Sequence, residues 1–384
     1  MLAIFSLASL GAFVSVVVAR GRFWLPGPFL PPRSEGKEQV WPRVVAVVPA
    51  RDEAELIGET LSALATQDYL GPWRVVLVDD NSSDGTSEAA RSIGAEGPFT
   101  VLTGSATPEG WAGKVWALAQ GVESAGDAEW LLFTDADISH DNDVVTRLVA
   151  LALTDDRDLV SIMAELRTVT VWERLVVPAF VYFFAMLYPF RWVSGSERVA
   201  AAAGGCVIVR ADLLARSGGL AAMRGAIIDD VTLARQIRTA GGRLWLGFDR
   251  GVQSIRAYPR LADLWQMVAR SAYDELDYSP LRLLGALGGL GLLFAVPLVT
   301  LAVSLSLAVT SALTFWTVSA MAAAALTLAL QAASYLPTIR LYRLSRWWAL
   351  TLPAAGLLYG AMTASSALAH KRGRGTSWKG RPLA

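Results

Sequence analysis

Short apolar runs alternate with polar segments through the first part of this chain. Val44–Val48 is one such run and is ended by Pro49, whereas Trp73–Val78 leads directly into two aspartates. Apolar runs of this length predict strands that are buried on both faces, as in a parallel sheet. We expect later strands at Leu159–Leu166 and Cys206–Val209.

The segments between these runs have the periodicity of helices. Glu53–Thr66 places Ile57, Leu61 and Leu64 on one helix face. Regular alternation of strands and helices predicts right-handed βαβ units, and therefore an α/β fold with a mostly parallel sheet. Residues 43–140 would form a nucleotide-binding half of this fold.

A pair of carboxylates follows the apolar residues Trp130–Phe133. Asp135 and Asp137 stand one residue apart at the end of this expected strand. Ligands of open α/β sheets bind at the carboxyl ends of the strands. Carboxylate oxygens also suit Mg²⁺ or Mn²⁺ holding a diphosphate. The alternative is a surface turn or a helix cap, because Asp141 and Asn142 follow.

Composition places part of the chain in a membrane. The 384 residues are 53% hydrophobic and only 18% charged, with a mean hydropathy of +0.41, whereas about a quarter of residues are charged in a typical soluble domain. The apolar excess lies in residues 1–19 and beyond Leu281. The net charge is zero, so nothing points to nucleic acid. The single cysteine, Cys206, rules out an intrachain disulfide.

The N-terminal apolar stretch, residues 2–19, predicts a retained membrane anchor over residues 1–20. A cleaved signal peptide would carry its basic residues before the apolar stretch, but here they follow it. These basic residues are Arg20, Arg22, Arg33 and Lys37. By the excess of positive charge on the cytoplasmic side, the part that follows is expected in the cytoplasm.

The C-terminal region, residues 281–370, predicts further membrane helices. Leu283–Val309 and Leu313–Leu336 are long enough to span a bilayer, and Trp347–Ala369 is a third candidate. A third span would place the basic tail, residues 371–384, outside, against the charge rule. Either the third segment is re-entrant or the charge bias is overridden.

Two common nucleotide-binding motifs are absent from the sequence. No G-x-G-x-x-G follows the first expected strand, which argues against a dinucleotide oxidoreductase. Gly113-Lys114 lacks the rest of a phosphate loop, because Pro108 occupies the position of its first glycine and Val115 replaces its Ser/Thr. A P-loop NTPase is therefore excluded.

Three segments in order resemble a known family. Pro49–Glu53, Val78–Thr86 and Asp135–Asp137 are similar to motifs of the family 2 inverting glycosyltransferases, which have the GT-A fold. The resemblance covers residues 43–275 and implies a catalytic domain over residues 38–280. It implies that the nucleotide, usually uridine, is held by Pro49, Ala50, Arg51, Glu53 and Asp80. A turn with a helix cap is the alternative explanation for Asp79 and Asp80.

The next candidate residues belong to the donor and acceptor sides of such a site. Lys114 opens an expected helix and could contact a sugar diphosphate, helped by the helix dipole; the alternative is a solvated surface lysine. In the family, a Gly-rich segment faces the acceptor and the donor sugar, and Gly204 and Gly205 match it. The alternative here is a bulged strand.

An acidic pair, Asp229 and Asp230, precedes an expected helix over Val231–Thr239. Ordinary helix capping is one explanation. The resemblance implies another, because the family commonly has Glu-Asp here and the second residue is the catalytic base. Asp230 matches that base, and Asp229 is a conservative departure on the acceptor side. A carboxylate in reach of a sugar hydroxyl can remove its proton.

Gln266 and Arg270 resemble part of the family's Gln-x-x-Arg-Trp signature, with Ser271 in place of the tryptophan. Their spacing puts both on one helix face, and Arg270 could pair with the diphosphate of the donor. The missing tryptophan weakens the case for a processive polysaccharide synthase. The alternative is a basic amphipathic helix on the membrane surface.

The segment of residues 172–192 contains an almost wholly apolar stretch, Leu175–Phe190, which a soluble enzyme does not need. This stretch is short of the roughly 20 residues that span a bilayer. Its flanking aromatic residues suit a helix in the membrane interface, where Phe183 and Leu187 would hold lipid. A buried core helix is the alternative.

The whole pattern is closest to the hopanoid-biosynthesis-associated branch of the family and more distantly similar to ceramide glucosyltransferases. It implies a nucleotide-sugar donor, a lipid acceptor, and a metal ion at Asp137 with Asp135 nearby. We expect a bacterial inner-membrane enzyme with its catalytic domain in the cytoplasm. The alternatives are a polyprenyl-phosphate sugar transferase, a polysaccharide synthase, and a nucleotide-binding membrane scaffold without activity.

Overall fold

The computed structural model describes residues 1–33, 40–94, 99–195, 199–310, 314–373, 377–378 and 381–382. The chain forms two compact units. The sheet unit comprises Gly27–Arg167, Phe190–Ala257 and Gly375–Ala384, and the helical unit comprises Met1–Pro26, Thr168–Pro189 and Tyr258–Arg374. The expected domain of residues 38–280 is thus divided between the two. Lys37, part of the expected charge bias, lies outside the described residues, as does half of the basic tail.

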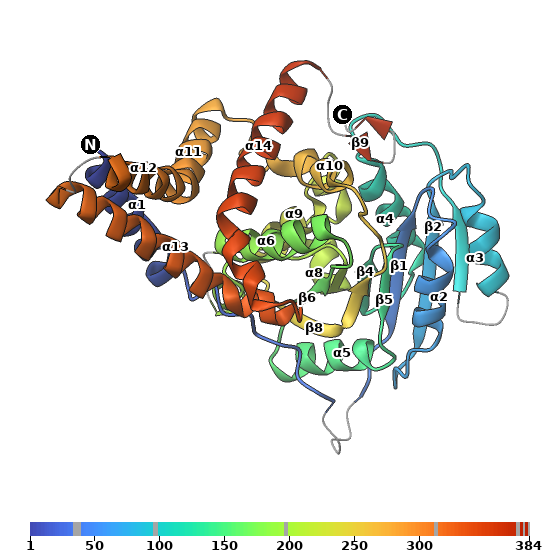
Figure 1. Ribbon diagram of the computed structural model, residues 1–384. Helices are drawn as coiled ribbons and strands as arrows, with labels where there is room; N and C mark the ends of the chain where they lie inside the picture. The colour runs from blue at the N-terminus through green and yellow to red at the C-terminus, as the bar shows by residue number, and fades with distance from the viewer. Residues whose placement is uncertain are drawn as a thin grey trace. The chain divides into compact units, whose positions relative to one another are not determined.

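The sheet unit is built on one eight-stranded mixed sheet with the strand order β3-β2-β1-β4-β7-β6-β8-β5 (Figure 1). The neighbouring strands β3, β2, β1 and β4 are parallel to one another, and β6 is parallel to β8. β7 and β5 run antiparallel to their neighbours. The expected mostly parallel sheet is confirmed. The strands are β1 Val44–Ala50, β2 Trp73–Asp79, β3 Phe99–Thr103, β4 Trp130–Thr134, β5 Ile138–His140, β6 Leu159–Glu165, β7 Cys206–Arg210 and β8 Leu244–Ser254.

Helices connect these strands in the alternating order that the sequence predicts. They are α2 Ile57–Ala65, α3 Thr86–Gly94, α4 Gly113–Ser124, α5 Val144–Thr154, α7 Phe190–Gly195, α8 Ala211–Arg216 and α9 Asp229–Thr239, with a short 3₁₀ helix η1 at Leu220–Met223. Two two-residue strands, β9 Ser377–Trp378 and β10 Arg381–Pro382, pair with each other.

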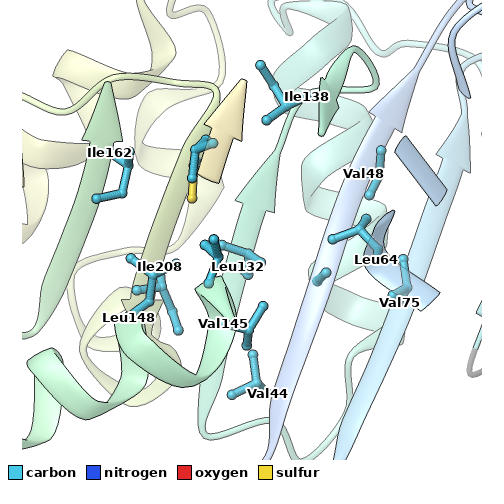
Figure 2. Close-up of a cluster of buried hydrophobic side chains, with 14 of the residues drawn as sticks. Val44, Val48, Leu64, Val75, Leu132, Ile138, Val145, Leu148, Ile162 and Ile208 are labelled. Carbon is cyan, nitrogen blue, oxygen red and sulfur yellow. The ribbon is translucent and has the colours of Figure 1, made fainter. Parts of the chain in front are cut away.

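The core of the sheet unit lies between the central strands and the helices that cover them. Figure 2 shows Val44 of β1, Leu132 of β4 and Ile208 of β7 in this cluster, with Val145 and Leu148 of α5 beside them. All five residues of β4 are buried. The continuous apolar runs of the sequence are therefore buried on both faces, as parallel strands between helices require.

Two expected boundaries were wrong. β1 continues through Pro49 to Ala50, where it pairs with β2. Proline fits there because the pairing of β1 with β4 ends at Val47. The first helix begins at Ile57 and not at Glu53, because the backbone amide of Glu53 donates to Thr86 Oγ1 and ties this segment to the loop after β2.

The helical unit contains the remaining long helices (Figure 1). They are α1 Leu2–Ala19, α6 Val171–Leu187, α10 Leu261–Ala272, α11 Pro280–Leu290, the π-helical turn η2 Gly291–Ala295, α12 Val296–Thr310, α13 Phe315–Leu341, the 3₁₀ helix η3 Arg346–Thr351 and α14 Leu352–Lys371. Among the described residues, five helical stretches are long and apolar enough to cross a membrane: Leu2–Ala19, Val171–Gly195, Pro280–Thr310, Phe315–Leu341 and Arg346–Lys371.

The α6 helix packs among the other helices of its unit. Phe183 is only 7% exposed, and its ring lies 4.9 Å from that of Tyr359 on α14. Its predicted contact with lipid was therefore wrong, because neighbouring helices already cover this side chain. Leu187 remains 48% exposed.

Candidate active site

The candidate residues of the sheet unit gather at one edge of the sheet. β1, β2 and β4 are parallel, so Ala50 at the end of β1, Asp80 after β2 and Asp135 after β4 all lie at the same edge of the sheet. β7 runs the other way and pairs its first residue with Thr134, which brings the preceding Gly204 to that edge too. The strand-end position expected for Asp135 and Asp137 is confirmed.

A pocket opens at this edge, and polar side chains occupy one side of it. Six of the predicted residues line it, namely Pro49, Lys114, Asp135, Gly204, Asp229 and Asp230. Apolar side chains such as Leu118, Phe133 and Met223 form the remaining wall. A mostly apolar pocket with a few convergent charged groups is the usual form of a small-molecule site.

Lys114 joins two carboxylates that are distant in sequence. Its Nζ lies 2.8 Å from Asp135 Oδ1 and 3.0 Å from Asp229 Oδ2, and its side chain is only 19% exposed. The alternative of a solvated surface lysine was therefore wrong. Burial lowers the pKa of Lys114, but the two carboxylates outweigh it and raise that pKa. The ammonium group stays charged and can face an anionic ligand.

Asp230 is held in place by hydrogen bonds from two backbone amides. Its Oδ2 accepts a hydrogen bond from the Gly204 N–H at 2.7 Å, and its Oδ1 accepts one from the Val231 N–H at 2.7 Å. Burial and the neighbouring charge of Asp229 raise the pKa of Asp230 to about 7. A carboxylate with a pKa near neutrality is suited to general base catalysis.

The position at which α9 begins shows that Asp229 and Asp230 are not N-cap residues. The helix begins at Asp229, two residues earlier than expected, and its N-cap residue is Ile228, which makes no side-chain capping bond. Both aspartates therefore lie in the first helical turn with their side chains in the pocket. The capping alternative does not describe their contacts.

The two glycines before β7 have different surroundings. A Cβ at Gly204 would lie 3.3 Å from Asp230 Oδ2 and 3.5 Å from Lys114 Nζ, so the missing side chain leaves the pocket open. A Cβ at Gly205 would instead meet the Ile138 and Ala164 side chains of the core. Gly204-Gly205 forms a turn and not a bulged strand. Packing explains Gly205, and its predicted acceptor role stays a prediction.

The two aspartates at the end of β2, Asp79 and Asp80, have different surroundings. Asp79 has the turn role, because it accepts hydrogen bonds from the Ser82 N–H at 3.1 Å and from the Ser82 and Ser87 hydroxyls. Asp80 is fully buried beside Arg51, whose Nη1 lies 3.8 Å from Asp80 Oδ2 and donates to the Asp80 carbonyl at 2.5 Å. Asp80 and Arg51 therefore form a neighbouring pair at the end of β1 and β2.

Arg256 is a site residue that the sequence analysis missed. Its Nη2 lies 2.5 Å from Glu53 Oε1, and its Nε lies 2.5 Å from Asp137 Oδ2. Burial lowers the pKa of Arg256, but the charges and hydrogen bonds of Asp137 and Glu53 outweigh it and raise that pKa. The only signal was an arginine two residues after the strand β8, which the sequence analysis had not predicted.

Gln266 and Arg270 lie on α10, which belongs to the helical unit. Leu264 and Val268 are buried on one face of this helix, whereas Gln266 and Arg270 are exposed. The amphipathic pattern is confirmed. Their role at the donor stays a prediction.

The two carboxylates at the end of β4 fit a divalent cation only if the phosphates of a bound substrate supply further oxygen ligands. Asp135 and Asp137 supply hard carboxylate oxygens, and each has a cationic partner on one oxygen. In the part of the chain that the structure describes, no group of three or more His, Cys, Asp or Glu side chains forms a metal site. Mg²⁺ is commonly bound by one or two carboxylates together with substrate phosphates, and these residues fit that pattern.

An open α/β sheet with charged groups and a pocket at its carboxyl edge defines a protein of the nucleotide-binding α/β class. The match to known families narrows this class. Residues 42–272, more than half of the chain, match the family described as "Glycosyltransferase like family 2". The chain belongs to this glycosyltransferase family.

Two known proteins illustrate the similarity. The probable glycosyltransferase YdaM of Bacillus subtilis (strain 168) is 26% identical over 185 residues, which cover 46% of this chain and 43% of YdaM. The chain thus matches less than half the length of that relative. The mannosyltransferase PcManGT from Pyrobaculum calidifontis, solved with GDP-Man and Mn²⁺, is 21% identical with a TM-score of 0.55 and covers 97% of this chain and 100% of its own. This likeness confirms the GT-A-like fold.

Proposed function

We propose that this protein transfers a sugar from a nucleotide-sugar to a lipid acceptor with inversion at the anomeric carbon. One observation carries the proposal. Asp230, with a pKa raised to about 7, shares a pocket with Lys114 and Asp135 at the carboxyl edge of the sheet. This arrangement places a base and a charged anion-binding group around one small site.

The reaction would be a single in-line displacement. An acceptor hydroxyl oxygen forms the new bond to the anomeric carbon while the bond from that carbon to the nucleoside diphosphate breaks. The carboxylate of Asp230 takes the hydroxyl proton. The Gly204 and Val231 amides hold that carboxylate in place, and Lys114 sits where it can pair with the departing diphosphate.

A divalent cation fits this proposal as a partner of the leaving group. Asp137, with Asp135 nearby, would hold Mg²⁺ or Mn²⁺, which neutralises charge on the diphosphate when bound. Arg256 pairs with Asp137 and Glu53 on the same edge. It would have to share Asp137 with the metal or give it up.

The finer parts of the proposal come from the sequence resemblance. They are a uridine nucleotide, a hopanoid as the acceptor lipid, and a bacterial inner membrane with the sheet unit in the cytoplasm. Apolar helices in the same chain support a lipid acceptor. A screen of nucleotide sugars with total membrane lipid, followed by mass spectrometry, would identify the new glycolipid, and product of increasing size would favour a polysaccharide synthase.

The base role of Asp230 is tested by Asp230→Asn. We expect donor binding to remain and transfer to fall about a hundredfold or more, in the range that general base catalysis contributes. Burial raises the pKa of this carboxyl above its unfolded value. Ionisation therefore costs stability as the pH rises toward 7. The amide removes this cost, but it can accept only one of the two N–H groups that hold the carboxylate, so retained donor binding is the measure that the variant is folded.

The control for this experiment is Asp229→Asn, which should be milder because Asp229 pairs with Lys114. Equal losses of donor binding and turnover in Asp230→Asn would assign Asp230 a structural role. Full transfer in that variant would favour an acceptor that needs no base, such as a polyprenyl phosphate. Donor binding without turnover in the parent would favour a membrane scaffold.

A further inference from the structure

The sheet shows that α6 does not cross a membrane. The chain leaves the sheet unit at Thr168, after β6, and returns at Phe190, before β7. β6 and β7 are hydrogen-bonded neighbours in one sheet. A single crossing between them would put these two strands on opposite sides of the bilayer. Val171–Gly195 is long and apolar enough to cross a membrane, but the pairing of β6 with β7 excludes a crossing.

Contacts within the helical unit tie both ends of α6 to the points where the chain joins the sheet unit. At its C-terminal end, Arg20 donates to the carbonyls of Met186 and Leu187, at 2.8 Å each. At its N-terminal end, Glu173 accepts from the Tyr258 N–H at 2.8 Å. Arg20 comes shortly before the sheet unit in sequence, and Tyr258 directly after it. Both ends of α6 are thus on the same side of the membrane.

The C-terminal end of α14 is tied to that side as well. The His370 ring stacks on the Tyr278 ring at 4.5 Å, and the Tyr273 N–H donates to Ser366 Oγ at 3.2 Å. Both tyrosines lie in residues 258–279, which connect the sheet unit to α11 and carry six charged side chains. Charged side chains are costly inside a bilayer, so this connection stays outside the hydrocarbon.

The N-terminal end of α14 reaches the same side by a different route. α1, α12 and α13 pack against one another, whereas α14 packs mainly on α10, α11 and η2. Within the helical unit, α14 runs across α13 and not alongside it (Figure 1). If α12 crosses outward and α13 crosses back, Arg343 and Arg346 before α14 return to the side of the sheet unit.

We infer that the chain crosses the membrane three times, with α1, with η2 and α12 together, and with α13, and that α6 and α14 lie in the interface on the side of the sheet unit. Residues 291–310 form a continuous helical stretch, about 30 Å long at 1.5 Å per residue. α11 precedes the π-helical turn η2, where helices commonly bend. This arrangement is independent of the sugar-transfer chemistry.

The contact between α6 and α13 agrees with an interfacial depth. The Tyr182 hydroxyl hydrogen-bonds to the Ser334 hydroxyl at 2.9 Å. Ser334 stands seven residues before the end of α13 at Leu341, or about 10 Å along the helix axis. Interfacial helices bury their apolar face to a similar depth of about 5–10 Å.

The charge pattern fits three crossings better than four. After Arg282 the sequence contains no acidic residue, and basic residues stand at both ends of α14. Arg343 and Arg346 precede it, Lys371 is its last residue, and Arg372 follows. Four crossings would separate these clusters, whereas three put both beside the anionic headgroups of one leaflet.

The test is the sidedness of labelling of single introduced cysteines by an impermeant maleimide in sealed vesicles of both orientations. The native Cys206 is fully buried and should not react in the folded parent, which is the background control. Ser92→Cys reports the side of the sheet unit, and Thr310→Cys reports the end of α12. We expect Ser345→Cys and Lys371→Cys to label from the side of Ser92, and Thr310→Cys only from the other.

Labelling of Lys371→Cys from the side of Thr310 would show that α14 spans and would overturn the inference. Arg372→Cys, also exposed, is a second report on this end if the first variant does not fold. Arg167→Cys and Arg191→Cys flank α6 and should both label from the side of Ser92. These readouts need no turnover, so a failed sugar-transfer assay would leave them unaffected.

Discussion

The pH dependence of the reaction is set at the scale of one residue and its neighbours. Burial and the charge of Asp229 raise the pKa of Asp230 to about 7. As a base, Asp230 acts only when deprotonated, so kcat/KM should rise with pH and level off above about 7. Asp229→Asn removes the neighbouring negative charge, so we expect the rise of kcat/KM to occur at lower pH in this variant. The pH profiles of kcat/KM for both proteins measure the shift.

If kcat/KM rose at the same pH in Asp229→Asn and in the parent, another titrating group would control the rate. Asp135 is the first to consider, because burial also raises its pKa, although Lys114 opposes this effect. Its side chain keeps 35% of its surface exposed, which weakens the effect of burial. Asp230 therefore remains the better candidate for a base near neutrality.

Gly204 and Gly205 offer a matched pair of substitutions at the same turn. In Gly204→Ala the new methyl group would lie 3.3 Å from Asp230 Oδ2, so we expect turnover to fall at least about tenfold with little change in melting temperature. In Gly205→Ala it would lie 3.1 Å from Ile138 Cδ1. That variant should mainly lose stability, by about 1–3 kcal/mol as in overpacked cores.

Steady-state kinetics and thermal unfolding of the two variants separate these effects. The Asp230 carboxylate depends on the Gly204 amide, so a small shift of the turn disturbs the base. If Gly205→Ala lost turnover and kept its stability, Gly205 would belong to the acceptor site after all.

At the scale of elements, α6 combines a packed face with an exposed one. Phe183 is 7% exposed and Leu187 is 48% exposed. Phe183→Ser should destabilise the protein by about 3 kcal/mol or more, as truncation of a buried aromatic residue does. Leu187→Ser should keep its stability and lower transfer to a lipid acceptor, if α6 guides that lipid. Unfolding curves and transfer assays in detergent and in vesicles measure both.

The matched control for this pair is the hydrolysis of the donor by water. Leu187→Ser should leave any such hydrolysis unchanged, because the sheet unit carries the pocket. Equal transfer by Leu187→Ser and the parent would remove α6 from the path of the acceptor. It would leave the packing of Phe183 unaffected.

At the scale of the whole molecule, one chain passes repeatedly between two units. The sheet unit is assembled from three stretches of sequence, and the helical unit from three others. A sheet cannot be divided by a bilayer, so the excursion through α6, between the paired strands β6 and β7, must return to the side from which it left. This constraint limits the crossings more strongly than hydropathy does, because hydropathy measures only the length and apolarity of each helix.

The sequence by itself determined the local features of this protein. Apolar runs predicted the buried strands β1, β2 and β4, because parallel strands need apolar residues on both faces. The carboxylates after β4 predicted one edge of the pocket, and the family motifs pointed to Asp230, which lines the same pocket. Each of these signals depends on residues that are close together in the chain.

Only the tertiary structure decided which charged groups meet. Arg256 reaches Glu53, 203 residues away, because β8 and β1 belong to one sheet, and Lys114 reaches Asp229 across the pocket. The same holds for α6, whose composition suits a buried, interfacial or spanning helix equally. Pairing of β6 with β7 excludes a crossing, because strand partners are chosen by long-range packing that no local pattern of residues records.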